Sequence, residues 1–206
     1  MKKTRILLAD DHAIVRMGLA SLLGMESDIE IVAEAADGEE AVAKARRTKP
    51  DVIIMDLMMP KLDGITATGK ILKSNPEVKI IILTSYGSSN GLAHAIETGA
   101  VGAVLKNSAE NDLVIAIRTV CDGKTFVSRE IQDQIAADPP VANLTKRQLE
   151  ILDSIVRGLS NADIAKQYNI SEITVKNHLT SIFAKIGASS RTEAATIALR
   201  KHLLKI

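Results

Sequence analysis

Short apolar runs alternate with amphipathic segments along residues 1–125, and this alternation limits the folds that are open to the chain. The runs "VIIM" (52–55) and "IIIL" (80–83) are continuously apolar. Such continuous runs are typical of strands that are covered on both faces, whereas strands with one wet face alternate apolar and polar residues. Five strand-then-helix repeats predict an α/β fold with a doubly wound, five-stranded parallel sheet. We take 2-1-3-4-5 as the strand order, although periodicity does not determine the order.

The expected elements of this first part have the following bounds. The strands are Arg5–Asp10, Ile29–Ala35, Asp51–Asp56, Lys79–Thr84 and Ala103–Lys106. The helices are Ala13–Leu23, Gly38–Arg47, Gly64–Ser74, Leu92–Thr98 and Asn111–Cys121. We therefore place a first domain at residues 1–123.

Residues 124–143 have no long period and contain Pro139 and Pro140, so we interpret them as a linker with one short helix around Arg129–Ala137. From residue 144 to the end the pattern is helical, which predicts a small all-α four-helix domain over residues 144–206. Its expected helices are Lys146–Gly158, Asn161–Tyr168, Glu172–Ile186 and Thr192–Leu203. Capping signals precede three of them, with Thr145, Ser160 and Ser190 each followed by Gln, Asp or Glu three residues later.

The two parts of the chain differ in charge. Residues 1–125 hold 15 Lys and Arg against 17 Asp and Glu, whereas residues 144–206 hold 10 against 5. A basic helical domain points weakly to nucleic acid, and ordinary scatter of surface charge is the alternative. The single cysteine, Cys121, excludes an internal disulfide and a cysteine-based zinc site. The sequence has neither an apolar run of membrane-spanning length nor the apolar core of a signal peptide, so we expect a cytoplasmic protein.

Polar residues stand at the carboxyl ends of four expected strands. These residues are Asp10 and Asp11 after the first strand, Asp56 on the third, Thr84 on the fourth and Lys106 on the fifth. Because the carboxyl ends of parallel strands meet at one edge of a sheet, the side chains should converge there. Three crowded carboxylates need a cation among them, and a ligand set of oxygens alone favours Mg²⁺. Taken singly, each residue also fits a helix cap or an exposed position, so the prediction depends on their joint placement.

With these residues, the first 125 residues resemble the receiver domain of two-component response regulators, which has a flavodoxin-like fold. The resemblance implies that Asp56 accepts a phosphoryl group from a histidine kinase. It also implies that Mg²⁺, or Mn²⁺ in its place, is bound by Asp11, Asp56 and the backbone carbonyl of Met58, with Asp10 acting mainly through a metal-bound water.

The same resemblance implies a signalling role for two further residues. Lys106 would pair with the phosphoryl oxygens, and Thr84 would hydrogen-bond to them as a switch hydroxyl. Many receivers have an aromatic switch residue three positions before the lysine, where this chain has Ala103. We therefore expect signalling through backbone and helix movement rather than through a moving aromatic ring.

The stretch "NADIAKQYNISEITVKNHLTSIFAKIG" (161–187) has the pattern of a helix-turn-helix, with a short helix, a turn at Asn169–Ser171 and a longer helix. The longer helix has an apolar stripe made of Val175, Leu179, Ile182 and Ile186 and joined by Phe183. Its opposite side has Lys176, Asn177, Thr180, Ser181 and Lys185. A recognition helix needs such a polar side for the major groove, whereas a solvated face on a helical bundle is the alternative. We interpret His178, at the edge of the stripe, as a packing residue, with a phosphate contact as the second choice.

The segments "LTKRQLEIL", "GLSNADIA", "SEITVKNH" and "SRTEA" resemble the LuxR-type helix-turn-helix domain. The resemblance implies base contacts from Lys176, Asn177, Thr180 and Ser181. It implies phosphate contacts from Thr174, Lys185 and Arg191 and from the caps Thr145 and Ser171. With its receiver, the chain is identified as a member of the NarL/FixJ family of response regulators. Membership implies a transcriptional regulator with a cognate sensor histidine kinase, double-stranded DNA as its target and a homodimer that phosphorylation promotes.

Two other classes of protein fit less well. An aspartate-nucleophile phosphatase of the haloacid dehalogenase type needs a second carboxylate two residues after the nucleophile, and position 58 is Met. A pure interaction adaptor would not need the basic outward helix face that this sequence predicts. We therefore expect a phosphoacceptor and DNA-binding regulator that is not an enzyme, although it would take part in its own phosphoryl transfer and dephosphorylation.

Overall fold

The computed structural model describes residues 3–85, 89–107, 110–142, 144–201 and 203–204. The chain divides into two compact units, residues 1–138 and residues 139–206. The first unit contains a parallel sheet, and the second is helical.

The sheet of the first unit has the strand order β2-β1-β3-β4-β5-β6, and all of its pairs are parallel. Its strands are β1 (Thr4–Ala9), β2 (Ile29–Ala35), β3 (Val52–Asp56), β4 (Lys79–Thr84), β5 (Gly102–Leu105) and β6 (Phe126–Val127). The predicted order of the first five strands is confirmed. The sixth strand was not predicted, because two residues are too short to produce a periodic pattern.

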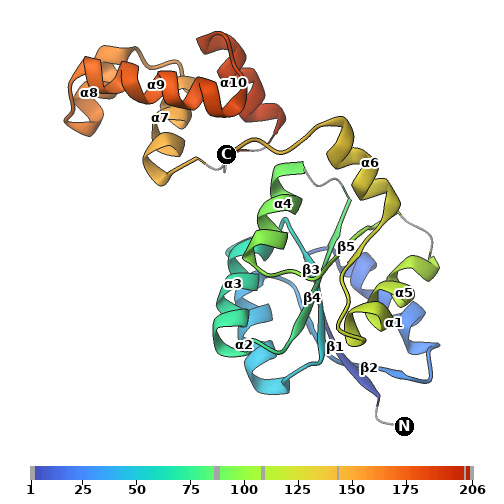
Figure 1. Ribbon diagram of the computed structural model, residues 1–206. Coiled ribbons are helices and arrows are strands. Elements are labelled where there is room, and N and C mark those ends of the chain that lie inside the picture. Colours follow the sequence, from blue (N-terminus) through green and yellow to red (C-terminus); the bar gives the residue numbers. More distant parts are fainter. Residues whose placement is uncertain (1–2, 86–88, 108–109, 143, 202, 205–206) are drawn as a thin grey trace. The chain divides into compact units, whose positions relative to one another are not determined.

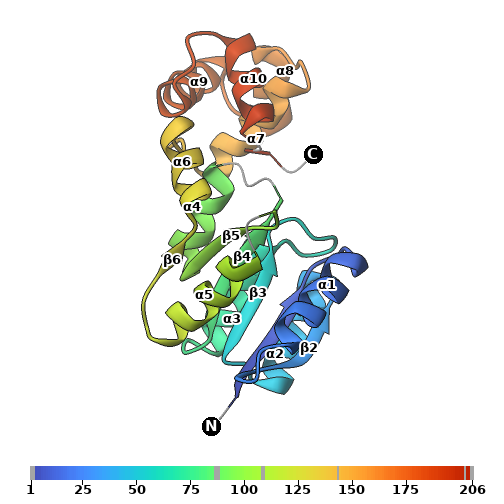
Figure 2. The ribbon, with the colours of Figure 1, turned by 90° about the vertical axis from the view of Figure 1, so that its right-hand side faces the viewer.

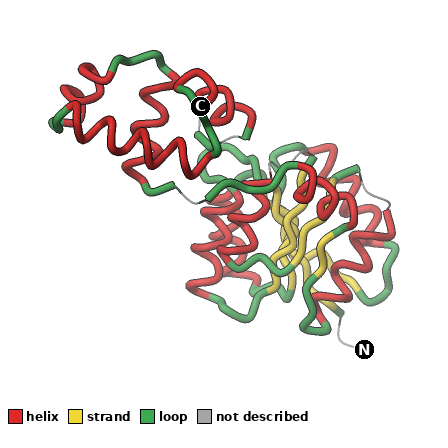
Figure 3. Tube along the Cα trace, turned by 45° about the horizontal axis from the view of Figure 1, so that its top comes forward, coloured by secondary structure: helices red, strands yellow, loops and turns green. Residues whose placement is uncertain are grey.

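Helices cover both faces of this sheet, as Figures 1 and 3 show. They are α1 (Ala13–Gly24), α2 (Gly38–Thr48), α3 (Gly64–Ser74), α4 (Ser89–Thr98), α5 (Glu110–Cys121) and α6 (Arg129–Ala137). One core joins α2, α3 and α4 to the sheet, and a second core joins α1 and α5 to its other face. Since both faces are covered, every residue of β3 is buried, which explains the continuously apolar run at residues 52–55.

The segment expected to be a linker, residues 124–143, belongs largely to the first unit. Strand β6 pairs with β5, and the Ser128 N–H donates a hydrogen bond to the Ala103 carbonyl at 3.0 Å. In α6, Ile131 is fully buried in the core that also contains Ala103. The boundary between the units follows residue 138, fifteen residues beyond the expected end of the first domain. Residue 143 lies outside the described residues. A short strand and one buried isoleucine are too weak a pattern to show such docking in a sequence.

The docking of α6 has a measurable consequence for stability. In the fragment 1–138, Ile131→Val removes one buried methylene and should lower the free energy of unfolding by about 1 kcal/mol. Ile14→Val is the matched control, because Ile14 is 85% exposed on α1, and it should change stability by less than about 0.5 kcal/mol. Urea unfolding monitored by circular dichroism measures both values. Equal stability of the two variants would mean that α6 is not packed on the rest of the first unit.

The second unit contains α7 (Lys146–Val156), α8 (Asn161–Tyr168), α9 (Glu172–Ile186) and α10 (Arg191–Arg200). Helix α9 packs against the other three around one apolar core (Figure 2). The capping predictions are confirmed. Thr145 and Ser160 form capping boxes with Gln148 and Asp163, and the Ser190 side chain accepts a hydrogen bond from the Glu193 N–H. Among the helices of the described residues, none is both long and apolar enough to cross a lipid bilayer.

Candidate functional site

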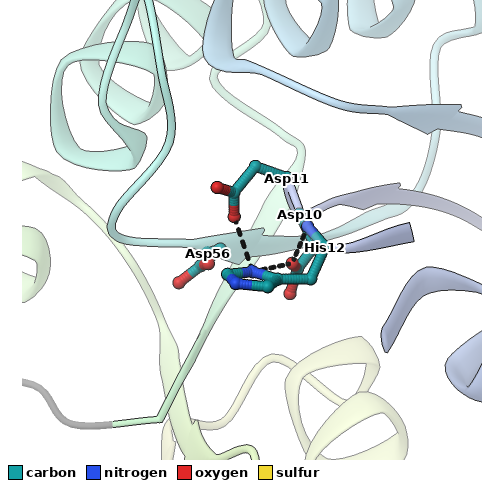
Figure 4. Close-up of side chains that lie close together, drawn as sticks. All are labelled: Asp10, Asp11, His12 and Asp56. Carbon is teal, nitrogen blue, oxygen red and sulfur yellow. Dashed lines mark hydrogen bonds and ion pairs between the residues drawn. The ribbon is translucent and has the colours of Figure 1, made fainter. Parts of the chain in front are cut away.

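Two buried carboxylates lie at the carboxyl edge of the sheet. Asp10 follows β1 and Asp56 ends the neighbouring strand β3, and their exposed fractions are 2% and 4%. Figure 4 shows them beside Asp11 and His12. One ligand atom from each of the four residues lies within 4.8 Å of the others. The loop after Asp56 returns close to the strand at Gly64, where a Cβ would overlap the Asp56 carbonyl oxygen, so only glycine permits this approach.

Lys106 joins the two buried carboxylates. Its Nζ lies 2.7 Å from Oδ2 of Asp56 and 2.6 Å from Oδ2 of Asp10. Burial raises the pKa of the Asp56 carboxyl, and the hydrogen bond and charge of Lys106 offset only part of that effect. Burial alone would lower the pKa of the Lys106 ammonium, but its bonds to Asp10 and Asp56 outweigh burial and raise it. Lys106 is therefore a fixed positive charge beside Asp56.

Thr84 is placed next to this group by the sheet. It ends β4, the strand between those of Asp56 and Lys106, and is 2% exposed. Its carbonyl accepts a hydrogen bond from the Lys106 N–H at 2.8 Å. The Met58 N–H donates to Oδ1 of Asp56 at 3.4 Å, while the Met58 side chain is exposed. Asp10, Asp11 and Lys106 therefore come together with Asp56, while Thr84 and Met58 are bonded to members of this group through backbone groups.

His12 is a member of the group that the sequence did not predict. Its Nδ1 lies 2.8 Å from Oδ1 of Asp11 and 3.3 Å from Oδ1 of Asp10. The backbone N–H of His12 donates a hydrogen bond to the same oxygen, Oδ1 of Asp10, at 2.8 Å. The sequence feature that could have predicted this position is that His12 directly follows Asp10 and Asp11 after β1, in "DDH".

The carboxylates of this group fit a magnesium ion. Oxygen ligands on opposite sides of Mg²⁺ lie about 4.2 Å apart, which is comparable with the spread seen here. Asp11 supplies a more exposed carboxylate to the same group, as the third oxygen donor. The donors that could hold the ion are thus Asp10, Asp11 and Asp56.

The position where many receivers have an aromatic residue is filled differently here. Ala103 is fully buried and pairs with Val127 of β6. Its core also contains Ile131 of α6. Ala103 is therefore covered by β6 and α6, which follow the five strand-and-helix repeats in the sequence.

The second group of predicted residues lies on α9. The predicted turn is observed, since Asn169 has a left-handed backbone and Ser171 caps α9 by accepting from the Thr174 N–H. The stripe Val175, Leu179, Ile182 and Ile186 is buried in the core of the unit. Lys176, Asn177 and Thr180 are exposed on the other side, and His178 is half-buried between the two.

Other side chains that were predicted to contact DNA form hydrogen bonds within the protein, among them those of Ser181, Lys185 and Arg191. Gln148, only 6% exposed, donates to the Ser181 hydroxyl and accepts from Lys185 Nζ, both at 2.9 Å. Arg191 donates to the Asn161 side chain at 3.2 Å and to the Leu159 carbonyl. Ser181 and Arg191 are therefore held in contacts between helices. Gln148 was predicted only as a capping partner, because its bonds to residues of α9 depend on helix packing.

Two family models match the chain, and together they account for both units. The response regulator receiver domain matches residues 6–118, and the LuxR family of bacterial regulatory proteins matches residues 142–198. A receiver fold followed by this helix-turn-helix domain defines a two-component response regulator, a phosphorylatable regulator of transcription. Within that class, the chain belongs to the NarL/FixJ family.

Relatives support this assignment over nearly the full length. The chain is 42% identical to the oxygen regulatory protein NreC of Staphylococcus haemolyticus, with 97% of this chain and 99% of the relative covered. It is 43% identical to NreC of Staphylococcus aureus, with 98% and 99% covered.

Solved structures of response regulators are also similar to this chain. The response regulator ChrA of a heme-sensing two-component system is 36% identical, with a TM-score of 0.59 over 99% of this chain and 100% of that one. The response regulator RcsB in its complex with DNA is 26% identical, with a TM-score of 0.71 over 96% and 98%.

Proposed function

We propose that Asp56 accepts a phosphoryl group from a cognate sensor histidine kinase, with Mg²⁺ held by Asp10, Asp11 and Asp56. The observation that carries this proposal is the buried contact of Asp56 with Lys106 at the edge where Asp10 and Asp11 also lie. Mn²⁺ would serve in place of Mg²⁺. The family resemblance implies one more oxygen ligand for the metal, the backbone carbonyl of Met58.

In this mechanism the chain supplies the nucleophile and the compensating charge. An oxygen of the Asp56 carboxylate attacks phosphorus, and the bond from phosphorus to the donor breaks. Lys106 stands 2.7 Å from Asp56, so its ammonium can neutralise the phosphoryl oxygens as charge develops on them. Bound Mg²⁺ would add further neutralisation. The product is an acyl phosphate on Asp56, at the end of β3. The hydroxyl of Thr84, which ends the neighbouring strand β4, would hydrogen-bond to it.

We further propose that α9 binds the major groove of double-stranded DNA through Lys176, Asn177 and Thr180, and that phosphorylation promotes a homodimer on two half-sites. The support is the exposed polar face opposite the buried stripe of α9. RcsB, which is 26% identical to this chain, has been solved in complex with DNA, in one structure as two dimers bound to two parallel DNAs. Light scattering with and without a phosphodonor measures the change in mass expected on dimerisation.

Removal of the metal tests the phosphoacceptor function. With acetyl phosphate as the donor, the full chain should gain one phosphoryl group in the presence of Mg²⁺ or Mn²⁺ and none in excess EDTA. The physical reason is that an anionic donor approaches three carboxylates, whose repulsion Lys106 alone does not cancel. Intact-mass spectrometry counts the added groups, and KCl at the same ionic strength in place of the magnesium salt controls for ionic strength. Equal modification in EDTA would contradict a role for the acidic group in holding a metal.

A further inference from the structure

One large apolar side chain lies among the polar groups on the outward face of α9. Ile173, in the first turn of the helix, is 71% exposed. Lys176, Asn177 and Thr180 are also exposed and follow it at spacings of three, four and seven residues. Residues with these spacings lie on one side of a helix. Ile173 therefore extends the face that we propose for DNA.

Neither packing nor helix formation explains an isoleucine at this position. The buried stripe of α9 begins at Val175, and Ile173 contributes nothing to the core of the unit. A β-branched residue is also a weaker helix former than alanine or the long polar residues. Single exposed apolar residues are common on protein surfaces, so the location of Ile173, rather than its exposure alone, carries the inference.

Hydrogen bonds to Gln148 of α7 distinguish two parts of α9. Ser181 and Lys185, towards its carboxyl end, are bonded to Gln148. The exposed side chains nearer the amino end, from Ile173 to Thr180, have no such bond to Gln148. Helix-turn-helix proteins contact base edges chiefly with the amino-terminal residues of the recognition helix. Ile173 is thus on the part of α9 that is best placed to meet bases.

We propose that Ile173 contacts the 5-methyl group of a thymine in the major groove and makes the chain select T at one position of each half-site. This inference rests on the proposed DNA-binding function. Thymine alone among the four bases carries a methyl group in the major groove, and apolar side chains read it by direct contact. The neighbouring Lys176 and Asn177 can donate hydrogen bonds to adjacent bases, so Ile173 adds a kind of recognition that they cannot supply.

Replacing thymine by uracil tests the contact, because uracil lacks only the methyl group. Phosphorylated full-length protein first selects its preferred site from random duplex DNA. Each thymine of that site is then replaced in turn by uracil, and affinities are measured by fluorescence anisotropy. At one position per half-site the replacement should weaken wild-type binding by about three- to tenfold. Ile173→Ala should lose the same factor on thymine DNA and bind thymine and uracil DNA equally.

Leu199→Ala is the matched control, because Leu199 is an exposed apolar residue of the same unit, on α10 rather than α9. It should keep the wild-type preference for thymine. The inference is overturned if no uracil penalty depends on Ile173, if the selected site has no thymine, or if Ile173→Ala weakens cognate and random DNA equally. If the wild-type protein selects no sequence at all, the proposed DNA-binding function fails and this inference fails with it.

Discussion

Asp56→Asn is expected to abolish phosphorylation of the chain by acetyl phosphate with Mg²⁺ present. The amide has nearly the shape of the carboxylate but no nucleophilic oxygen anion. Burial raises the pKa of the Asp56 carboxyl, so a neutral group is well tolerated there. Lys106 also keeps its ion pair with Asp10. The variant should therefore be folded and unreactive, with no phosphoryl group detected by intact-mass spectrometry.

A neighbouring aspartate provides the control for this result. Asp63 caps α3, with its side chain accepting from the Thr66 N–H, and asparagine caps helices equally well. Asp63→Asn should therefore be phosphorylated like the wild type. Modification of Asp56→Asn to the wild-type extent would place the acceptor at another residue, and loss of reactivity in both variants would indicate a general effect on the loops at this edge.

Asn177→Ala should lose roughly 1–3 kcal/mol of binding free energy on the cognate site and much less on random DNA. The reason is that a contact to a base edge depends on sequence, whereas a contact to a phosphate does not. Asn177 is exposed on the outward face of α9 and can pair with the edge of an adenine. Fluorescence anisotropy on both DNAs over a series of salt concentrations measures the difference.

Lys185→Ala is the comparison for this prediction. Lys185 lies two turns further along α9, where its amine is bonded to Gln148. An ammonium has three donors, so the bond to Gln148 leaves Lys185 able to contact a phosphate. The Lys185→Ala variant should therefore bind both DNAs more weakly by the same factor, and the slope of its affinity against salt should be lower by about one unit. If Asn177→Ala also weakened both DNAs equally, α9 would not be oriented in the groove with Asn177 towards the bases.

Much of the first unit could be predicted from the sequence because its signals are local. Continuous apolar runs such as 80–83 indicated strands buried on both faces, and the polar residues after them marked one edge of the sheet. Asp10, Asp56 and Lys106 meet there in the structure. The caps of the second unit were predictable for the same reason, since a cap and its partner are three residues apart.

Other features depended on contacts between distant parts of the chain. The docking of α6 through Ile131 and the place of His12 beside Asp11 leave only weak patterns in the sequence. Ser181 looked as free as Thr180 on a helical projection, but it accepts a hydrogen bond from Gln148, 33 residues away.

The sequence by itself thus determined the two folds, the family and the edge of the sheet where the acidic group forms. Tertiary structure decided which polar side chains of α9 are free, and it assigned residues 124–138 to the receiver. Periodicity shows which side of an element is buried, because each element must cover its own apolar surface. It does not show which distant donor a polar side chain finds, because that partner is fixed only when the helices pack.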